Sequence, residues 1–139
     1  MILLTQNRSL PGPSAVKASK LGVPVYALGG AAAAASASLK ATPVVGADRV
    51  ATSVKAAEMF VPQATTAVLA SGGGFADALS GGALAANKGG LLLLTRPESV
   101  TPALAAHRRR SSYTEVLVSG GKRSVFDATM RRVAELLRR

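Results

Sequence analysis

The sequence predicts an α/β fold in which helices cover both faces of a parallel sheet, giving three layers, α/β/α. Short apolar runs alternate with helix-length segments along the whole chain. The runs are too uniformly apolar for half-exposed strands, and such runs are typical of buried parallel strands. Ala and Gly supply much of the 48% hydrophobic content, and these small residues suit helices that lie tightly on a sheet.

Six strands and six helices are expected in alternation. The apolar runs predict strands at 2–4, 23–28, 44–45, 66–70, 91–94 and 116–119. The segments between them predict helices at about 13–20, 31–39, 49–60, 75–87, 101–108 and 124–137. Three of these helices carry start signals: Asp48 precedes the third, Pro102 suits the first turn of the fifth, and Ser124 precedes the last. The last helix is expected to bury one stripe, formed by Phe126, Met130, Val133 and Leu137.

The net charge of the chain limits the classes of partner that it is expected to bind. The chain carries +10, from 17 Lys and Arg against seven Asp and Glu. Nine of the basic residues lie between 107 and 139, including the run Arg108, Arg109 and Arg110, which is either a helix end or a polyanion contact. Such a surplus favours nucleic acid, anionic wall polymers or anionic lipid surfaces, or it serves solubility alone.

Several function classes are disfavoured. Only 4% of residues are aromatic, and none interleave with Lys and Arg as a nucleic-acid platform needs. No apolar run reaches the ~20 residues that span a bilayer, so no membrane insertion is expected. Without cysteine and with a single histidine, His107, the chain offers no disulfide and no multi-histidine metal site. Because no catalytic set can be assembled, we expect no enzyme, no cofactor and no metal.

The chain contains an internal repeat. Residues 2–5 match 92–95 at an offset of 90, and residues 25–30 match 116–121 at an offset of 91. Two blocks in the same order with near-equal offsets indicate a repeat. Residues 1–43 therefore look like the C-terminal part of one repeat, and 44–139 like a nearly complete second one, with both in one compact domain.

Five blocks resemble the motifs of cell-wall-binding repeat 2, at 44–53, 67–72, 75–86, 92–95 and 118–121. The resemblance implies a Rossmann-like module that usually occurs in threes about a pseudo-threefold axis in secreted bacterial proteins. Members of that family attach non-covalently to anionic wall polymers. The N-terminal residues lack a charged region followed by an apolar one, so no signal peptide is expected.

The resemblance implies a non-catalytic adhesion module on the bacterial cell surface. Its partner would be an anionic cell-wall glycopolymer, and one and a half repeats would reach threefold symmetry by forming a homotrimer. The alternative is a structural or adhesive subunit of a surface assembly, such as a phage virion, that reuses the module.

The carboxyl ends of the predicted strands are the expected polymer-binding surface. Ten residues follow strands there: Ser71, Gly72, Gly73, Gly74, Thr95, Arg96, Gly120, Gly121, Lys122 and Arg123. The glycine run lies where backbone N–H groups can cradle an anion, or it is simply a tight turn. Thr95 and Arg96 are placed near the polymer by the resemblance alone.

A second group of residues is expected to have structural or interface roles. Asp48 and Arg49 are interpreted as a helix N-cap beside a buried or interface arginine, and a fork-shaped contact of Arg49 with an anion stays open. Asp77, in a first helical turn, stabilises the helix dipole. Leu92, Leu93 and Leu94 form a buried strand, which the resemblance places near the surfaces where modules meet.

Overall fold

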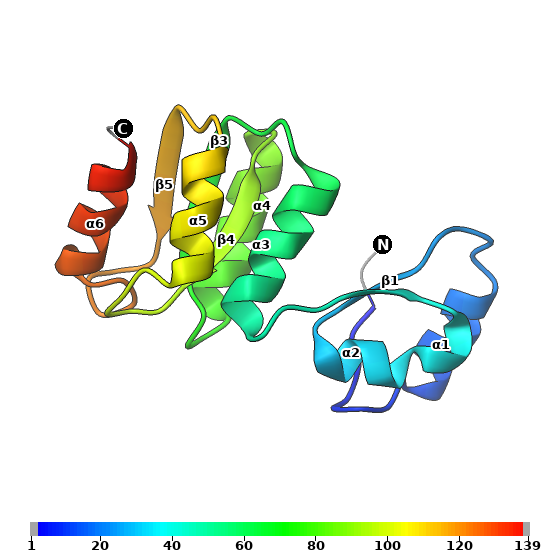
Figure 1. The fold of residues 1–139 in the computed structure, drawn as a ribbon. Helices are drawn as coiled ribbons and strands as arrows, with labels where there is room; N and C mark the ends of the chain where they lie inside the picture. Colours follow the sequence, from blue (N-terminus) through cyan, green and yellow to red (C-terminus); the bar gives the residue numbers. More distant parts are fainter. Residues whose placement is uncertain (1–2, 138–139) are drawn as a thin grey trace. The chain divides into compact units, whose positions relative to one another are not determined.

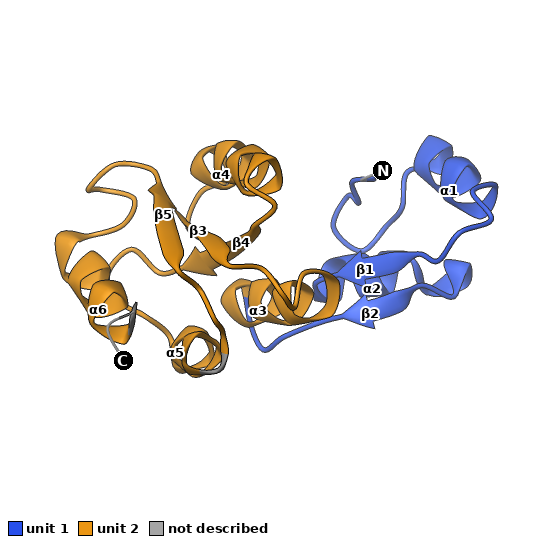
Figure 2. Cartoon of the chain, turned by 90° about the horizontal axis from the view of Figure 1, so that it is seen from above, with its two compact units in different colours: residues 1–48 blue, residues 49–139 orange. Residues whose placement is uncertain are grey.

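The structure is a computed structural model that describes residues 3–137, apart from the side chains of Arg110 and Leu137. The chain forms two compact units, Met1–Asp48 (unit 1) and Arg49–Arg139 (unit 2), shown in Figures 1 and 2. Unit 1 contains α1 (Gly12–Ser19), β1 (Tyr26–Leu28), α2 (Gly30–Ala35), the 3-10 helix η1 (Ala37–Leu39) and β2 (Thr42–Val44). Unit 2 contains α3 (Arg49–Phe60), β3 (Thr66–Ser71), α4 (Ala76–Asn87), β4 (Leu91–Thr95), α5 (Pro102–Arg110), β5 (Glu115–Ser119) and α6 (Asp127–Leu137).

Unit 2 is a three-layer α/β/α sandwich. Its three strands are parallel in the order β4-β3-β5. The connection from β3 to β4 and the connection from β4 to β5 cross the sheet in opposite directions, so right-handed crossovers place α4 and α5 on opposite faces. Figure 2 shows α4 above the sheet and α3, α5 and α6 below it. The predicted fold class is confirmed.

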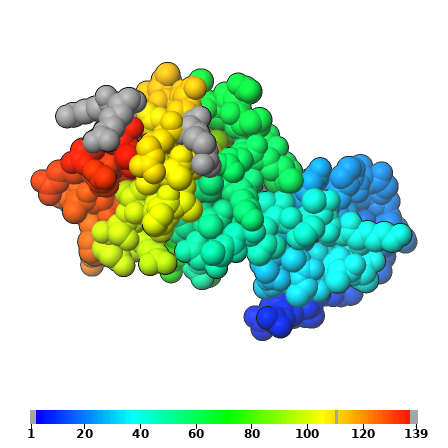
Figure 3. All heavy atoms as spheres, in the orientation of Figure 1, coloured from blue at the N-terminus to red at the C-terminus, as the bar shows by residue number. Residues whose placement is uncertain are grey.

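The core of unit 2 lies around β3, whose six residues are all buried. On the face covered by three helices, the buried cluster consists of Val50, Val54, Ala57, Ala64, Ala67, Leu69, Leu91, Leu93, Leu104, Tyr113 and Val133. The outer surfaces of α3, α5 and α6 adjoin in the space-filling view (Figure 3). On the other face α4 approaches the sheet through small residues, Gly81 and Ala85, which are its buried positions.

Unit 1 has a two-stranded parallel sheet in which Tyr26 pairs with Thr42 and Leu28 with Val44. Its buried apolar residues are small: Ala18, Ala27 and Val44. An apolar cavity of about 670 Å³ is lined by residues of this unit, among them Leu3, Leu10, Leu21, Val25 and Leu39. Among its described residues, unit 1 therefore has the elements of a repeat end, with an open apolar hollow beside them.

Three predicted strands differ from the structure. The strand expected at 44–45 lies at Thr42–Val44 instead and shares only Val44 with the prediction. The strand at 2–4 is wrong for the described residues: Leu3 and Leu4 form no strand, Leu4 is 80% exposed, and Ile2 lies outside the described range. A strand needs a neighbour to satisfy its backbone, and the two strands of unit 1 pair with each other instead. The strand at 23–28 begins only at Tyr26, after Pro24, which has no N–H to donate.

The helices of unit 2 follow the prediction closely, except for α6. α3 begins and ends where predicted, and α5 begins at Pro102 after Thr101, whose side chain accepts a hydrogen bond from Leu104 N–H at 3.4 Å. The start predicted for α6 at Ser124 is wrong: Ser124 and Val125 N–H donate to Gly121 O in a separate turn, and the helix begins at Asp127.

The buried stripe predicted for α6 is confirmed only in part. Val133 is buried and Met130 half-buried as predicted, but Phe126 is 45% exposed, and the other buried side chains here are those of Val125, Thr129 and Leu136. Thr129 Oγ1 donates to Pro97 O at 2.9 Å, which fixes the rotation of the helix and turns Thr129 inward. The side chain of Leu137, and Arg138 and Arg139 of the predicted basic region, lie outside what is described. In unit 1, the helix predicted at 31–39 is divided at Ser36 into α2 and η1.

Candidate functional site

Three loops of unit 2 lie at the carboxyl edge of its parallel sheet. Loop 71–74 follows the central strand β3, loop 95–96 follows β4, and loop 120–123 follows β5. Because the helices that follow β3 and β5, α4 and α6, lie on opposite faces of the sheet, the carboxyl ends of β3 and β5 form a topological switch point, where open α/β sheets bind ligands. The structure thus brings the ten candidate binding residues to one edge.

Loop 71–74 is held by its own hydrogen bonds. Gly72 N–H donates to Thr95 O at 2.8 Å, and Gly73 N–H donates to Ser71 Oγ at 3.1 Å. Ser71 is buried, whereas Gly73 and Gly74 are exposed. The N–H groups of Gly72 and Gly73 therefore already donate within the chain, which makes the loop an ordered turn and leaves these two groups less available to bind an anion.

Arg49 positions the same loop. Arg49, the first residue of α3, donates from Nη1 to Gly72 O. A Cβ added at Gly72 would lie 3.1 Å from Arg49 Cδ and 3.5 Å from Thr95 O, so a side chain there would crowd the arginine, which would have to shift slightly. This hydrogen bond is compatible with the structural role expected for Arg49, which stays a prediction.

Loop 95–96 presents one buried and one exposed side chain. Thr95 is fully buried, and its Oγ1 lies 3.3 Å from Arg96 O and 3.2 Å from Ser99 O, to which it can donate. Arg96 is exposed. Thr95 therefore orders the loop from inside, and Arg96 is the residue of this pair whose side chain reaches solvent.

Loop 120–123 combines a strained glycine with two exposed cations. Gly120 has a φ of +114°, and a Cβ there would lie 2.5 Å from Asp77 Oδ2. Gly121, Lys122 and Arg123 are exposed. Lys122 Nζ lies 3.6 Å from Asp127 Oδ2, a solvent-exposed pair that contributes little stability.

The carboxylate of Asp77 occupies the gap between α4 and β5. Asp77 lies in the first turn of α4 and abuts Gly120. Ser80, one turn further along, lies 3.3 Å from Ser119 at the end of β5, oxygen to oxygen. A negative charge in the first turn of a helix stabilises its dipole, but it also repels a second anion at this end of α4. Any anion at this edge would be held by Arg96, Lys122 and Arg123.

Comparison with known proteins gives a family for this fold and site. A family model described as cell wall binding domain 2 (CWB2) matches residues 44–130. The chain belongs to this family. The family predicted from the five sequence blocks is therefore confirmed, and the chain carries a cell-wall-binding module of the CWB2 type.

Two solved structures share the CWB2 fold. Cwp8 from Clostridium difficile has a TM-score of 0.78 at 25% identity, over 99% of this chain and 25% of that one. Cwp6 from Clostridium difficile has a TM-score of 0.78 at 21% identity, over 96% of this chain and 23% of that one. The chain spans about a quarter of the length of these structures. No curated protein matches the sequence.

The residues expected at CWB2 interfaces are mostly internal. Leu93 is buried in the core, and Leu92 and Leu94 are half-buried. A Cβ at Gly81 of α4 would lie 3.3 Å from Leu92 Cδ1, which shows how closely this helix covers the strand. Asp48 is the last residue of unit 1, directly before α3, and its role as an N-cap stays a prediction.

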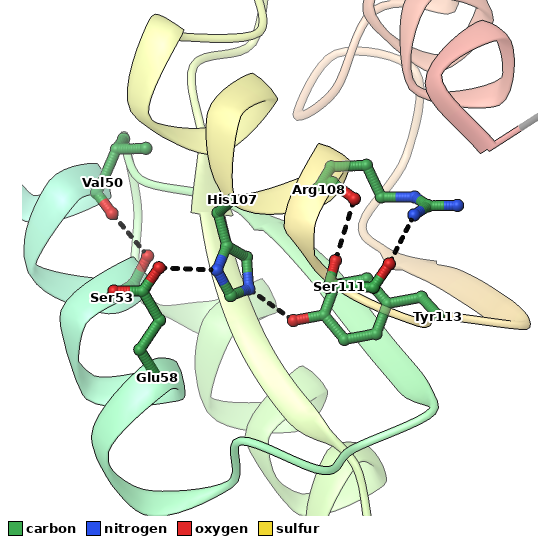
Figure 4. A network of polar contacts seen from close by, with 7 residues as sticks. All are labelled: Val50, Ser53, Glu58, His107, Arg108, Ser111 and Tyr113. Atoms are coloured by element: carbon green, nitrogen blue, oxygen red, sulfur yellow. Dashed lines mark hydrogen bonds and ion pairs between the residues drawn. The ribbon is translucent and has the colours of Figure 1, made fainter. Parts of the chain in front are cut away.

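One buried polar network of the CWB2 module was missed by sequence reasoning. His107 Nδ1 lies 3.0 Å from Glu58 Oε1, and its Nε2 contacts Tyr113 OH (Figure 4). Burial raises the pKa of the Tyr113 phenol. The network ties α3 to α5 and to the start of β5. No motif spacing signals it, because Glu58 and His107 are 49 positions apart.

Between residues 3 and 137, no group of three or more His, Cys, Asp or Glu side chains converges as a metal site would require. In the same part of the chain, no helix has both the length and the apolar character to cross a membrane.

Proposed function

We propose that this CWB2 module is a non-catalytic adhesion module that binds an anionic polymer of the bacterial cell wall. One observation carries the proposal: three exposed cationic side chains, those of Arg96, Lys122 and Arg123, follow two strands at the carboxyl edge of the sheet. Family membership supports the cell wall as the target. The net charge of +10 supports an anionic partner.

The loops favour contact with an extended chain of charges. Gly73, Gly74 and Gly121 are exposed and have no side chain that would hold a polymer away from the backbone. Arginine offers paired donors to phosphate or carboxylate, and lysine offers a mobile point charge. Ser71 and Thr95, both buried, would act by ordering the loops rather than by contact.

The module would act on the cell surface within a threefold assembly, formed by three copies or with further repeats. Exposed apolar side chains on α4 support an assembly. Phe75, directly before the helix, is 82% exposed, and Leu79, one turn later, is 73% exposed. Large apolar side chains that face solvent together mark interaction surfaces. Sedimentation of the chain is expected to give a trimer, and Leu79→Lys a smaller species.

Cosedimentation with purified bacterial cell walls tests the polymer. The protein should pellet with intact walls at low salt, and binding should fall after the anionic glycopolymer is extracted, since the peptidoglycan left behind lacks that charge. Undiminished binding to extracted walls would contradict an anionic polymer as the target. Binding to neither preparation would contradict adhesion itself.

A further inference from the structure

The sheet of unit 1 shows which element can pair with the second edge of a strand equivalent to β5. Residues 25–30 and 116–121 are the same block of the repeat, so β1 and β5 are equivalent strands. β5 pairs with β3 on one edge and is the terminal strand of the sheet among the described residues. β1 pairs in parallel with β2. The question is whether β2 lies on the edge of β1 that corresponds to the open edge of β5.

The backbone hydrogen bonds show that β2 lies on the edge of β1 that corresponds to the open edge of β5. Val25 O accepts from Thr42 N–H at 2.8 Å, and Gly29 N–H donates to Val44 O at 3.0 Å, so positions 25, 27 and 29 of the first repeat face β2. The offset of 91 converts these positions to 116, 118 and 120. Glu115 N–H donates to Thr65 O at 3.2 Å, toward β3. In a parallel strand alternate residues bond to opposite sides, so 116, 118 and 120 point away from β3.

The strand on β1 lies at the boundary between the two repeats. The CWB2 match begins at Val44, the last residue of β2, so Thr42 and Pro43 precede it, and β2 pairs within unit 1. The strand that leads into this repeat, here called its opening strand, thus completes the sheet of the repeat before it. The same arrangement one repeat later would place an opening strand on β5.

Two other sheet edges are closed, in contrast to that of β5. In β2, Thr42 and Val44 face β1, so Pro43 faces outward and offers no N–H there. At the edge of β4, Leu94 N–H donates to Ser53 Oγ of α3 at 3.0 Å. The open edge of β5 has Val116, Val118 and Gly120, with neither a proline nor a charged residue, and all five residues of β5 are only half-buried.

We infer that the outer edge of β5 binds the opening strand of a further CWB2 repeat, in parallel and with the β1–β2 register. Val118 and Gly120 N–H would donate to that strand, as Ala27 and Gly29 are placed to do in unit 1. The chain route is short, because α6 returns to the end of the sheet where β5 begins (Figure 1). This inference does not depend on the polymer proposed above.

Amide hydrogen exchange on an extended chain tests the inference. The full chain would carry, after Arg139, a short Gly/Ser linker and a copy of residues 41–47. The Val118 and Gly120 amides should then exchange at least roughly tenfold more slowly than in the unextended chain, because they gain partners in the new strand. The Leu117 and Ser119 amides, which face β3, should not change.

The control extension has the same length, with proline in place of the residues equivalent to Thr42 and Val44, which removes both N–H donors that face the edge. It should give no protection. Equal protection by both extensions, or none by the first, would overturn the inference. Protection that already exists in the unextended chain and rises with protein concentration would also overturn it, because a second copy would then occupy the edge.

Discussion

At the residue scale, close contacts at two glycines shape the carboxyl edge, and the one at Gly120 leaves no room for a Cβ. Gly120 combines a left-handed φ with the Asp77 carboxylate, and Gly72 lies against Arg49. These contacts hold loops 71–74 and 120–123 in place before any ligand arrives. A glycine in such a loop therefore indicates close packing between elements. Whether the loop also binds a ligand depends on the side chains beside the glycine.

Gly120→Ala should destabilise unit 2 by about 2 kcal/mol or more, because the new Cβ adds a strained φ to a clash with Asp77. Gly121→Ala is the matched control, since nothing lies within 4 Å of its added Cβ and its φ is not positive. Urea unfolding measures both. Similar losses in the two variants would contradict the packing described for Gly120.

Tyr113 should make stability depend on pH above neutrality. Burial raises the pKa of the phenol above its ordinary value of 10, so folding favours the neutral form. That contribution is complete below pH 10 and is lost as the pH rises through the folded-state pKa. The advantage of the wild type over Tyr113→Phe, about 1 kcal/mol near pH 8 from the lost hydrogen bond, should shrink toward pH 11. A constant difference across this range in urea unfolding would contradict it.

At the element scale, α4 lies close to the sheet because it presents Gly81 to it. A Cβ at Gly81 would lie 3.0 Å from Ser119 Cβ, whereas one at Gly82 would meet only Leu92 Cδ2, at 3.9 Å. α4 therefore packs on β4 and β5 through the one face that can approach them.

Gly82→Ala and Gly81→Ala separate helix propensity from this packing. Alanine favours the helix over glycine by about 1 kcal/mol at either position. Gly82→Ala should therefore raise the melting temperature by a few degrees. Gly81→Ala should give no such stabilisation, because the added Cβ would push α4 away from the sheet. Equal stabilisation of both variants would show that α4 packs less tightly than described.

Elements with strong local signals were predictable. The strands β3, β4 and β5 and the helix α3 were predicted within one residue of their bounds, because apolar runs and helix-length segments alternate cleanly there. The strand at 2–4 failed, since an apolar run forms a strand only beside a partner. The buried face of α6 was predicted only in part, because the hydrogen bond from Thr129 Oγ1 to Pro97 O turns a polar residue inward and has no signal in the sequence.

At the scale of the whole molecule, the repeat and the compact units have different boundaries. The repeat drawn from the sequence begins at Val44, whereas the units divide between Asp48 and Arg49. Residues 44–48 belong to the second repeat by sequence and to unit 1 by contact. The carboxyl-edge loops could be predicted from the alternation of parallel strands and helices, but the network around His107 could not, since its members are distant in sequence.

The cations at the carboxyl edge are proposed to bind the wall polymer. Affinity for purified walls tests this proposal, in a comparison of Lys122→Gln/Arg123→Gln with Lys17→Gln/Lys20→Gln, which removes two exposed charges from unit 1 instead. Two lost contacts of about 0.7 kcal/mol each should raise the Kd of the edge variant about tenfold, and the control should stay within about twofold of the wild type. Equal weakening of binding in the two variants would show that binding depends on net charge alone. Unchanged affinity of the edge variant would contradict a polymer-binding site at the carboxyl edge.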